Sequence, residues 1–483
     1  MAINPSICLL VVMTVSVVTG FAQTKDEAAD QTPSAQAGSS AAPAAGSIDT
    51  QVTSEENPPI SGLDQPSFES KILNRSFLLP ALHASQALDT NVESEAGRTR
   101  IEGVTRLLGS LTLQKLGSHS SLALDYLGGV ALYSSRSIGS NQIQQVDFTD
   151  RLQWRTGYIT FRDSFSYLPE GSFGYGAYGG TGAASGTGFG GVGGGLPGGG
   201  FSGFFGGGQF GAIGQVPRVN NTSIVDVVQA LSRRSSLTLA GAFSLVHFSD
   251  NPQGFINSQQ VSGQAGYSYQ ISRKDQVALL YGYQAFRYPA AVGVNFNSHV
   301  INVLFSRRIS GRMDLVLGGG PQLTHVNSVL GGVTDNWSAS GRATLRYRFK
   351  LTTAELSYHH YNTTGSGFFG GAKSDIARIG LRRSFGRRWE GRTDIGYTHN
   401  TRLAPTLLGG ISADSFNYVF VGAALRRQFS RTFDGFVSYQ FNDLNFNSAT
   451  GPLCALVGPC DRSSQRHVAT IGIDWHPRPI RID

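Results

Sequence analysis

The sequence predicts an all-β fold, a transmembrane antiparallel up-and-down β-barrel of about 18 strands, with about 16 as the alternative. The first observation behind this prediction is a period-two alternation of polar and apolar residues that recurs along most of the chain. The second is that short polar turns alternate with longer loops rich in Gly, Asn and Ser. The third is composition: 15% of the 483 residues are charged and 40% are hydrophobic, which is less charge than a soluble protein of this length normally carries.

Residues 1–22 have the features of a secretory signal peptide. An apolar run from Ile7 to Val18 is followed by small residues and by a cleavage site after Ala22. The run is too short for a membrane-spanning helix. One departure from the usual signal-peptide pattern is that the residues before the run include no Lys or Arg. The sequence therefore predicts an exported protein.

Residues 23–74 are rich in Ala, Ser, Gln and Pro and contain almost no aromatic residues. Such a segment cannot bury enough apolar surface to fold, so we expect a disordered periplasmic segment here. The pattern changes at about residue 75, and the barrel is expected over 75–483.

The alternation places two kinds of side chain on opposite faces of each strand, because successive residues of an extended chain point in opposite directions. In "RATLRYRF", three arginines and a threonine alternate with Ala, Leu, Tyr and Phe. The polar faces use small and charged residues throughout, which is typical of a wet lumen and unlike a packed core. Strands are expected near 76–89, 101–115, 119–134, 142–155, 157–168, 222–233, 235–248, 258–271, 274–288, 297–309, 311–326, 335–349, 351–364, 373–385, 388–401, 415–428, 431–445 and 464–475.

These features resemble the outer-membrane porins of Gram-negative bacteria. The blocks "VTRLLGSLTLQKL" and "LALDYLGGVALYS" are similar to segments of barrel proteins of that class. The resemblance implies a location in the outer membrane, contact with outer-membrane lipid and insertion by the barrel-assembly machinery. The short turns would then be periplasmic and the long loops external. One departure is that the chain continues past Trp475 into "HPRPIRID", whereas such barrels usually end on an aromatic residue.

Residues 171–213 form a Gly-rich segment between the fifth and sixth expected strands. Its formal GxGxxG lacks the strand, the helix and the Lys-Ser/Thr that a phosphate site requires. One interpretation is a flexible external loop. The other follows from the porin resemblance, in which a loop at this position folds into the lumen and narrows it. The aromatic residues that would then form the constriction are Phe173, Tyr175, Tyr178, Phe201, Phe204 and Phe205.

Eight arginines lie on the faces that the alternation assigns to the lumen. A charge on the lipid face near the midplane costs about 2–4 kcal/mol, so the apolar faces are expected in lipid. Confined lumenal cations concentrate anions. Two alternatives stay open: arginines beside the turns anchor at headgroups, or acidic residues such as Glu355, Glu390, Asp394 and Asp434 cancel the field. The predicted pore-lining arginines are Arg342, Arg346, Arg348, Arg378, Arg382, Arg392, Arg426 and Arg466.

Cys454 and Cys460 are the two cysteines outside the signal peptide. Their spacing, in an exported chain and a Gly/Pro-containing segment, predicts a disulfide in the last external loop. No second Cys or His pair stands at zinc-ligand spacing, and the sequence contains no HExxH, GxSxG or paired-carboxylate constellation. We therefore expect no metal, no cofactor and no catalytic residues.

The charge of the chain is uneven. Residues 24–97 hold three of the 39 basic and eleven of the 32 acidic residues, which leaves 36 basic and 21 acidic residues elsewhere. Export argues against nucleic acid as the partner of this basic body, and anionic solutes or lipid headgroups are better candidates. The sequence thus predicts a porin-like channel, not an enzyme, for passive diffusion of small hydrophilic, anionic solutes. An export barrel for an acidic polysaccharide, a surface adhesin or structural barrel, and a homo-oligomer remain alternatives.

Overall fold

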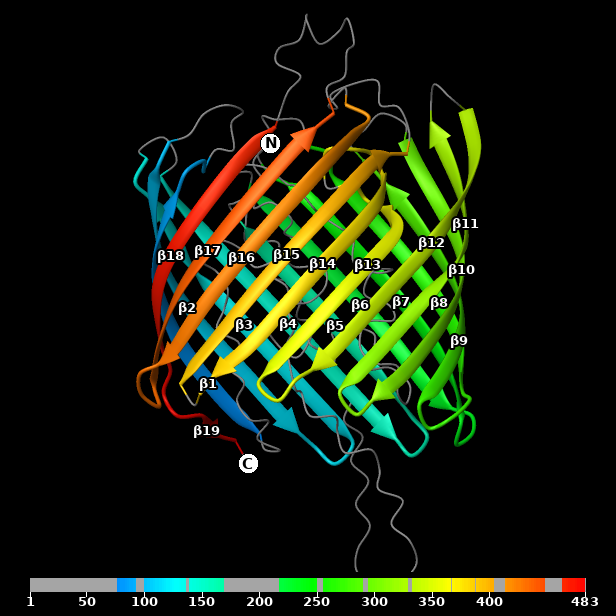
Figure 1. Ribbon diagram of the computed structural model, residues 1–483, viewed down its shortest axis with the longest axis horizontal. Helices are drawn as coiled ribbons and strands as arrows, with labels where there is room; N and C mark the ends of the chain where they lie inside the picture. Colours follow the sequence, from blue (N-terminus) through cyan, green and yellow to red (C-terminus); the bar gives the residue numbers. More distant parts are fainter. Residues whose placement is uncertain are drawn as a thin grey trace, which may run out of the picture. The chain divides into compact units, whose positions relative to one another are not determined.

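The computed structural model shows an antiparallel β-barrel, drawn in Figure 1. The described residues are 76–92, 100–135, 139–168, 217–249, 255–289, 294–328, 332–365, 367–386, 388–403, 413–447 and 463–482, without the side chains of residues 392 and 394. The expected signal peptide, periplasmic segment, Gly-rich loop and disulfide lie outside these ranges and stay predictions. Within the described ranges, no helix is long and apolar enough to cross a membrane.

The predicted fold class is confirmed, and within the described ranges eighteen long strands form the barrel. The strands are β1 (Phe77–Asp89), β2 (Glu102–Leu116), β3 (Ser120–Tyr133), β4 (Ser140–Trp154), β5 (Gly157–Leu168), β6 (Arg218–Ala230), β7 (Ser235–Phe248), β8 (Ser258–Gln270), β9 (Asp275–Arg287), β10 (Val294–Ser310), β11 (Met313–Ser328), β12 (Gly332–Arg348), β13 (Thr352–Thr363), β14 (Ala372–Phe385), β15 (Trp389–Arg402), β16 (Ser415–Gln428), β17 (Phe433–Phe446) and β18 (Ser464–Trp475).

The barrel closes where β1 pairs with both β2 and β18. The tail beyond Trp475 adds a short strand, β19 (Ile480–Arg481), which pairs with Phe77 and Leu78 on the same side of β1 as β18. Pro80 lies in the interval between the two ladders, where β1 has no partner on that side among the described residues. The N–H that proline lacks is therefore not needed by a neighbouring strand, which explains how β1 accommodates it.

The two faces of the sheet have the inverse of a soluble protein's polarity. On the outer face of β10, Ile301 and Val303 are 48% and 53% exposed, whereas on its inner face Ser298 and Ser306 are buried. The same alternation recurs on the other strands, whose outward Leu, Ile, Val and aromatic side chains are exposed while inward Ser, Thr, Gln, Asp and Arg side chains are buried. A closed barrel with this polarity is an outer-membrane-type barrel, with lipid around it.

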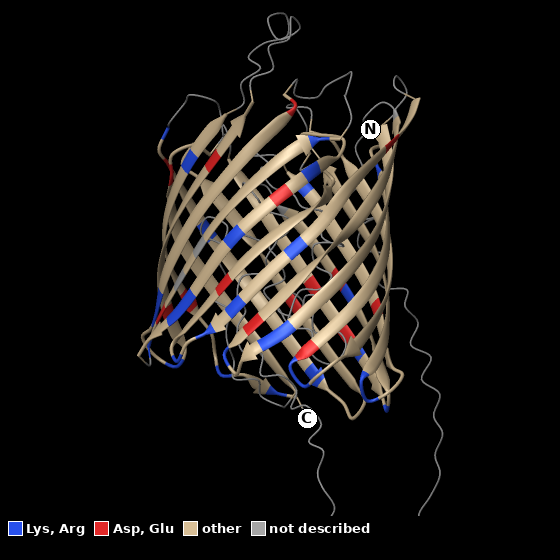
Figure 2. Cartoon of the chain, turned by 45° about the vertical axis from the view of Figure 1, so that its right-hand side comes forward, with Lys and Arg blue, Asp and Glu red and all other residues tan. Residues whose placement is uncertain are grey.

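The two ends of the barrel differ in chemistry. Lys and Arg gather around the end with the short turns, which we call the turn end (Figure 2). There, guanidinium groups stack on outer-face aromatics: Arg427 lies 5.0 Å from the ring centroid of Trp389. At the other end, the loop end, outer-face tyrosines meet histidines, as in the 2.8 Å contact between Tyr439 Oη and His467 Nδ1. Aromatic residues at both ends are typical of the two membrane–water interfaces.

Candidate functional site

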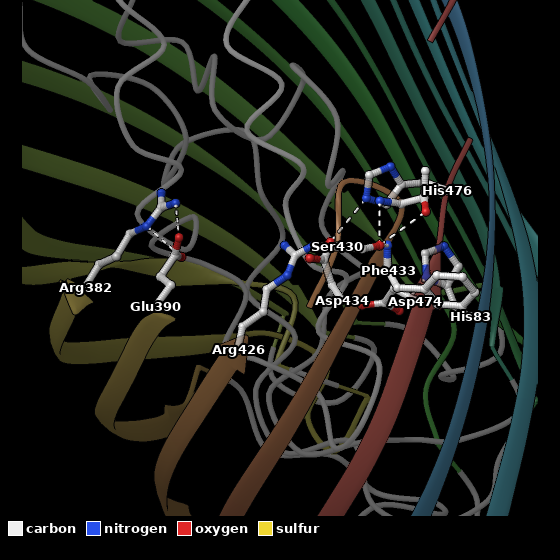
Figure 3. Close-up of polar contacts among 10 residues, drawn as sticks. His83, Arg382, Glu390, Arg426, Ser430, Phe433, Asp434, Asp474 and His476 are labelled. Carbon is white, nitrogen blue, oxygen red and sulfur yellow. Dashed lines mark hydrogen bonds and ion pairs between the residues drawn. The ribbon is translucent and has the colours of Figure 1, made fainter. Parts of the chain in front are cut away.

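The candidate site is the inner wall of the barrel, where ion pairs join neighbouring strands near the turn end (Figure 3). Arg382 on β14 and Glu390 on β15 form a bidentate pair, with Nε–Oε1 and NH2–Oε2 distances of 2.9 and 3.0 Å. Arg426 NH2 on β16 lies 2.7 Å from Asp434 Oδ2 on β17, and His476 Nε2 lies 3.2 Å from the same oxygen. Such bidentate and shared contacts hold the guanidinium planes in fixed orientations.

Two more of the predicted arginines form pairs beside these. On β12, Arg346 lies 2.7 Å from Glu355 of β13, and Arg348 lies 2.9 Å from Asp314 of β11. These contacts favour the second alternative left open by the sequence, in which acidic residues offset part of the arginine charge. The pairs run along the wall between adjacent strands, because antiparallel register places their members opposite or diagonally opposite.

The remaining predicted arginines have different surroundings. Arg378 on β14 is buried, with its guanidinium carbon 6.0 Å from the ring centroid of Phe420. Arg342 lies on the inner face of β12, opposite His359 of β13. The backbone of Arg392 lies opposite Arg382, and its side chain is outside the described part. Arg466 is buried on β18, where its Nε lies 2.8 Å from Asp89 Oδ2 of β1.

Among the described residues, the sequence did not single out three buried inner-face arginines: Arg106 on β2, Arg162 on β5 and Arg218 on β6. Arg162 NH2 lies 3.1 Å from Asp226 Oδ1 of β6. Each of the three is the single arginine of its strand, so none shows the repeated alternation that marked β12 and β14. Each could have been found from its position on the polar face of its own strand.

The inner wall is electrostatically lopsided. Strands β12 to β16 present six arginines with described side chains, against Glu355 and Glu390. On the other side, Asp125 of β3 and Asp147 of β4 face the lumen and bond to Thr112 and Ser164. In a ring of eighteen strands β4 and β13 are nine positions apart, so these two aspartates, which have Arg106 of β2 and Arg162 of β5 on either side, lie across the lumen from the arginines of β12–β16. The surplus of described positive charge therefore lies on the β12–β16 side, and an anion in this lumen would be drawn toward it.

A loop that the sequence placed outside the barrel crosses the lumen at the loop end. We define the lumen-crossing loop as Thr364–Gly371, of which Ser366 is not described. The Phe368 ring lies 5.5 Å from that of Phe255, just before β8, and 5.2 Å from that of Phe446, at the end of β17. Because β8 and β17 are nine strands apart, these tilted and edge-to-face ring contacts join opposite walls.

The lumen-crossing loop is held by backbone bonds as well as by rings. Ile256 N donates to Gly367 O at 2.8 Å, and Leu403 N donates to Gly371 O at 3.1 Å. Gly367 and Gly371 have φ of 81° and 98°, and a Cβ on either would fall within 3 Å of a phenylalanine ring. These two positions therefore require glycine. The expected constriction residues Phe173, Tyr175, Tyr178, Phe201, Phe204 and Phe205 lie outside the described residues.

Within the described ranges, no three His, Cys, Asp or Glu side chains are grouped so as to hold a metal ion. The chemistry available on the inner wall is thus that of fixed charges, hydroxyls and amides. It can orient and discriminate solutes by charge.

No family model matches the chain, and no curated protein matches it in sequence. Among solved structures, it is similar to the outer membrane protein OpdK of Pseudomonas aeruginosa, with 11% identity, a TM-score of 0.42, and coverage of 83% of this chain and 98% of that one. It is also similar to OccK2 (OpdF) of the same organism, solved with glucuronate, at 9% identity and a TM-score of 0.42, over 84% and 98% of the two chains. At this level the likeness concerns the fold alone.

Proposed function

We propose that the protein is an outer-membrane channel for passive diffusion of small hydrophilic solutes, with a preference for anions. The observation that carries the proposal is the lopsided inner wall. Even when the flanking Asp314 and Asp434 are counted with Glu355 and Glu390, the six arginines of β12–β16 outnumber the carboxylates that pair with them. A confined surplus of positive charge lowers the free energy of an anion in the lumen and raises that of a cation.

The ion pairs favour a graded preference for anions over strict exclusion of cations. A guanidinium held by a carboxylate still presents donors to a passing anion, but its long-range field is partly cancelled. The predicted pore-lining residues Arg342, Arg346, Arg348, Arg378, Arg382, Arg392, Arg426 and Arg466 would act as a wall of donors along which an anion exchanges hydrogen bonds.

The lumen-crossing loop would set the aperture at the loop end. Its rings join opposite walls, so solutes must pass beside Phe368 and the buried Phe369. In this proposal the Gly-rich segment 171–213 provides a second restriction, with Phe173, Tyr175, Tyr178, Phe201, Phe204 and Phe205 facing inward.

The proposal is tested by reconstituting the full chain in a planar bilayer and measuring single-channel steps and the reversal potential in a salt gradient. We expect discrete steps and a reversal potential on the anion side of zero. Absence of steps would reject a channel, and a cation-side potential would reject the preference.

A further inference from the structure

The β12–β13 ladder is shorter than the two strands that form it. Their pairing stops at Gly341 and His360. Toward the loop end β12 stays paired with β11 as far as Gly332, and β13 stays paired with β14 as far as Thr363. Residues 332–340 therefore have no ladder partner on the β13 side within the described ranges. At about 3.3 Å per residue, this edge is about 30 Å long.

The end of β13 lies on the lumen side of the barrel wall. By alternation, Asn362 belongs to the outer face of β13, with Tyr358 and His360. Its Nδ2 nevertheless donates to Thr324 Oγ1 at 2.8 Å and to Ser298 Oγ at 3.3 Å. Both acceptors are buried inner-face side chains of β11 and β10. An outer-face group of β13 can reach them only if the end of β13 lies behind β10 and β11.

The end of β12, in contrast, stands away from the wall. Residues 332–337 are exposed on both faces, with Val333 at 70% and Trp337 at 73%. The β11–β12 hairpin projects beyond the end of β13 at the right of Figure 1. The two strands thus separate into a seam, with β12 outside and β13 inside.

The inward path of the end of β13 accounts for both the seam and the lumen-crossing loop. The loop continues directly from Thr363, so the inward path of β13 carries Phe368 across the lumen. Tyr288 Oη donates to Thr364 O at 3.3 Å and holds the start of the loop inside. The lumen-crossing loop therefore narrows the pore along the barrel axis at the same end of the barrel at which β12 and β13 separate in the wall.

The two sides of the seam's base differ in polarity. Arg342 and His359 face the lumen as an opposed pair one position below the last rung. On the outer face Trp337 is 73% exposed, and Leu356 and Tyr358 are 49% and 43% exposed. Exposed Trp and Tyr mark the level of the membrane–water interface.

From this arrangement we propose that the β12–β13 seam is a lateral portal for a single-chain anionic amphiphile, between the lumen and the membrane at the loop end. Arg342 and His359 would receive the anionic head, and the alkyl chain would lie through the seam against Trp337 and Leu356. Charge complementarity inside and apolar exposure outside select this ligand class over the small hydrophilic solutes proposed above.

A pair of double-cysteine variants tests the seam. Continuing the register of the ladder would place Ser338 opposite Thr363, so S338C/T363C spans the seam. T344C/S357C, an opposed pair inside the ladder, is the matched control. In membranes, we expect oxidation to link T344C/S357C and to leave S338C/T363C unlinked. Equal linkage of the two pairs would show that the β12–β13 ladder continues to Ser338 and Thr363, and would overturn the proposal.

Transport provides the second readout. A short bis-methanethiosulfonate reagent bridges each pair in proteoliposomes, and entry of a fluorescent long-chain alkyl sulfonate and chloride conductance are both measured. Bridging S338C/T363C should reduce sulfonate entry to that of protein-free vesicles and leave chloride conductance unchanged, while the bridged control keeps both. R342Q, without any bridge, should also slow sulfonate entry several-fold. Unchanged sulfonate entry after bridging would refute the portal. If the protein without cysteine substitutions conducts no chloride, only the channel proposal is refuted.

Discussion

Arg466 of β18 and Asp89 of β1 form a buried ion pair across the closure of the barrel. The side chains are 2% and 0% exposed, and Nε lies 3.1 and 2.8 Å from the two carboxylate oxygens. The first and last long strands are therefore joined by charge as well as by their backbone ladder. Removing one member of such a pair leaves the other charge buried without its counterion, which costs about 3–5 kcal/mol.

We predict that Asp89→Asn lowers the temperature at which the folded barrel converts to the unfolded band on gels. Asp275→Asn is the matched control, because it removes the same charge from a pair whose guanidinium, that of Arg307, is 56% exposed. The control should shift the conversion temperature much less, since solvent screens the remaining guanidinium. Equal shifts in the two variants would show that the closure pair has no special weight.

The arginines of β12 should control the sign of ion selectivity. R342Q/R346Q/R348Q keeps hydrogen-bonding groups and removes three inner-face charges, so the reversal potential should move toward zero. The effect should be largest at low salt, because charges are screened over about 10 Å at 0.1 M. Arg383→Gln, on the outer face of β14 and 5.2 Å from the Phe385 ring centroid, removes a charge outside the lumen. If that control moves the potential as far as the triple variant does, the lumenal assignment is wrong.

Glu355→Gln should have the opposite effect. It leaves the Arg346 guanidinium without the carboxylate that now lies 2.7 Å away. The local surplus of positive charge grows by one, and the reversal potential should move further to the anion side. A shift toward cations would mean that Glu355 does not offset the field of Arg346.

Phe368→Ala should raise single-channel conductance, because the narrowest section of a pore dominates its resistance and this ring joins opposite walls. Phe161→Ala, at a 39% exposed ring on the outer face of β5, is the matched control and should leave conductance unchanged. Deleting residues 175–208 tests the Gly-rich segment in the same assay: a severalfold rise is expected if it folds inward. No change in Phe368→Ala would place the constriction elsewhere.

The strands were predictable because each one repeats a simple rule. In β12, for example, four polar residues alternate with apolar ones from Arg342 onward. Because a charged side chain in lipid is costly, this alternation also determines which face of the strand points to the lumen. Pro80 made β1 the least obvious strand, and the interval between β18 and β19 supplies the reason that it fits.

The lumen-crossing loop was not predictable in the same way. Its sequence, "TGSGFFGG", has the composition of an ordinary external loop. Its inward path depends on Phe248 and Phe255 from one wall and Phe416 and Phe446 from the other. Those contacts join segments far apart in the chain, and alternation within single strands carries no information on them. The same holds for the end of β13, whose Asn362 contacts β10 and β11.

The most direct test of the proposed channel is the reversal potential of single channels formed by the full chain in a planar bilayer under a tenfold salt gradient (~58 mV limit for ideal selectivity). The lopsided inner wall predicts discrete conductance steps with a potential on the anion side, well short of the ideal limit because most arginines are paired. A potential on the cation side, or a bilayer that shows no steps although the barrel is folded, would contradict it.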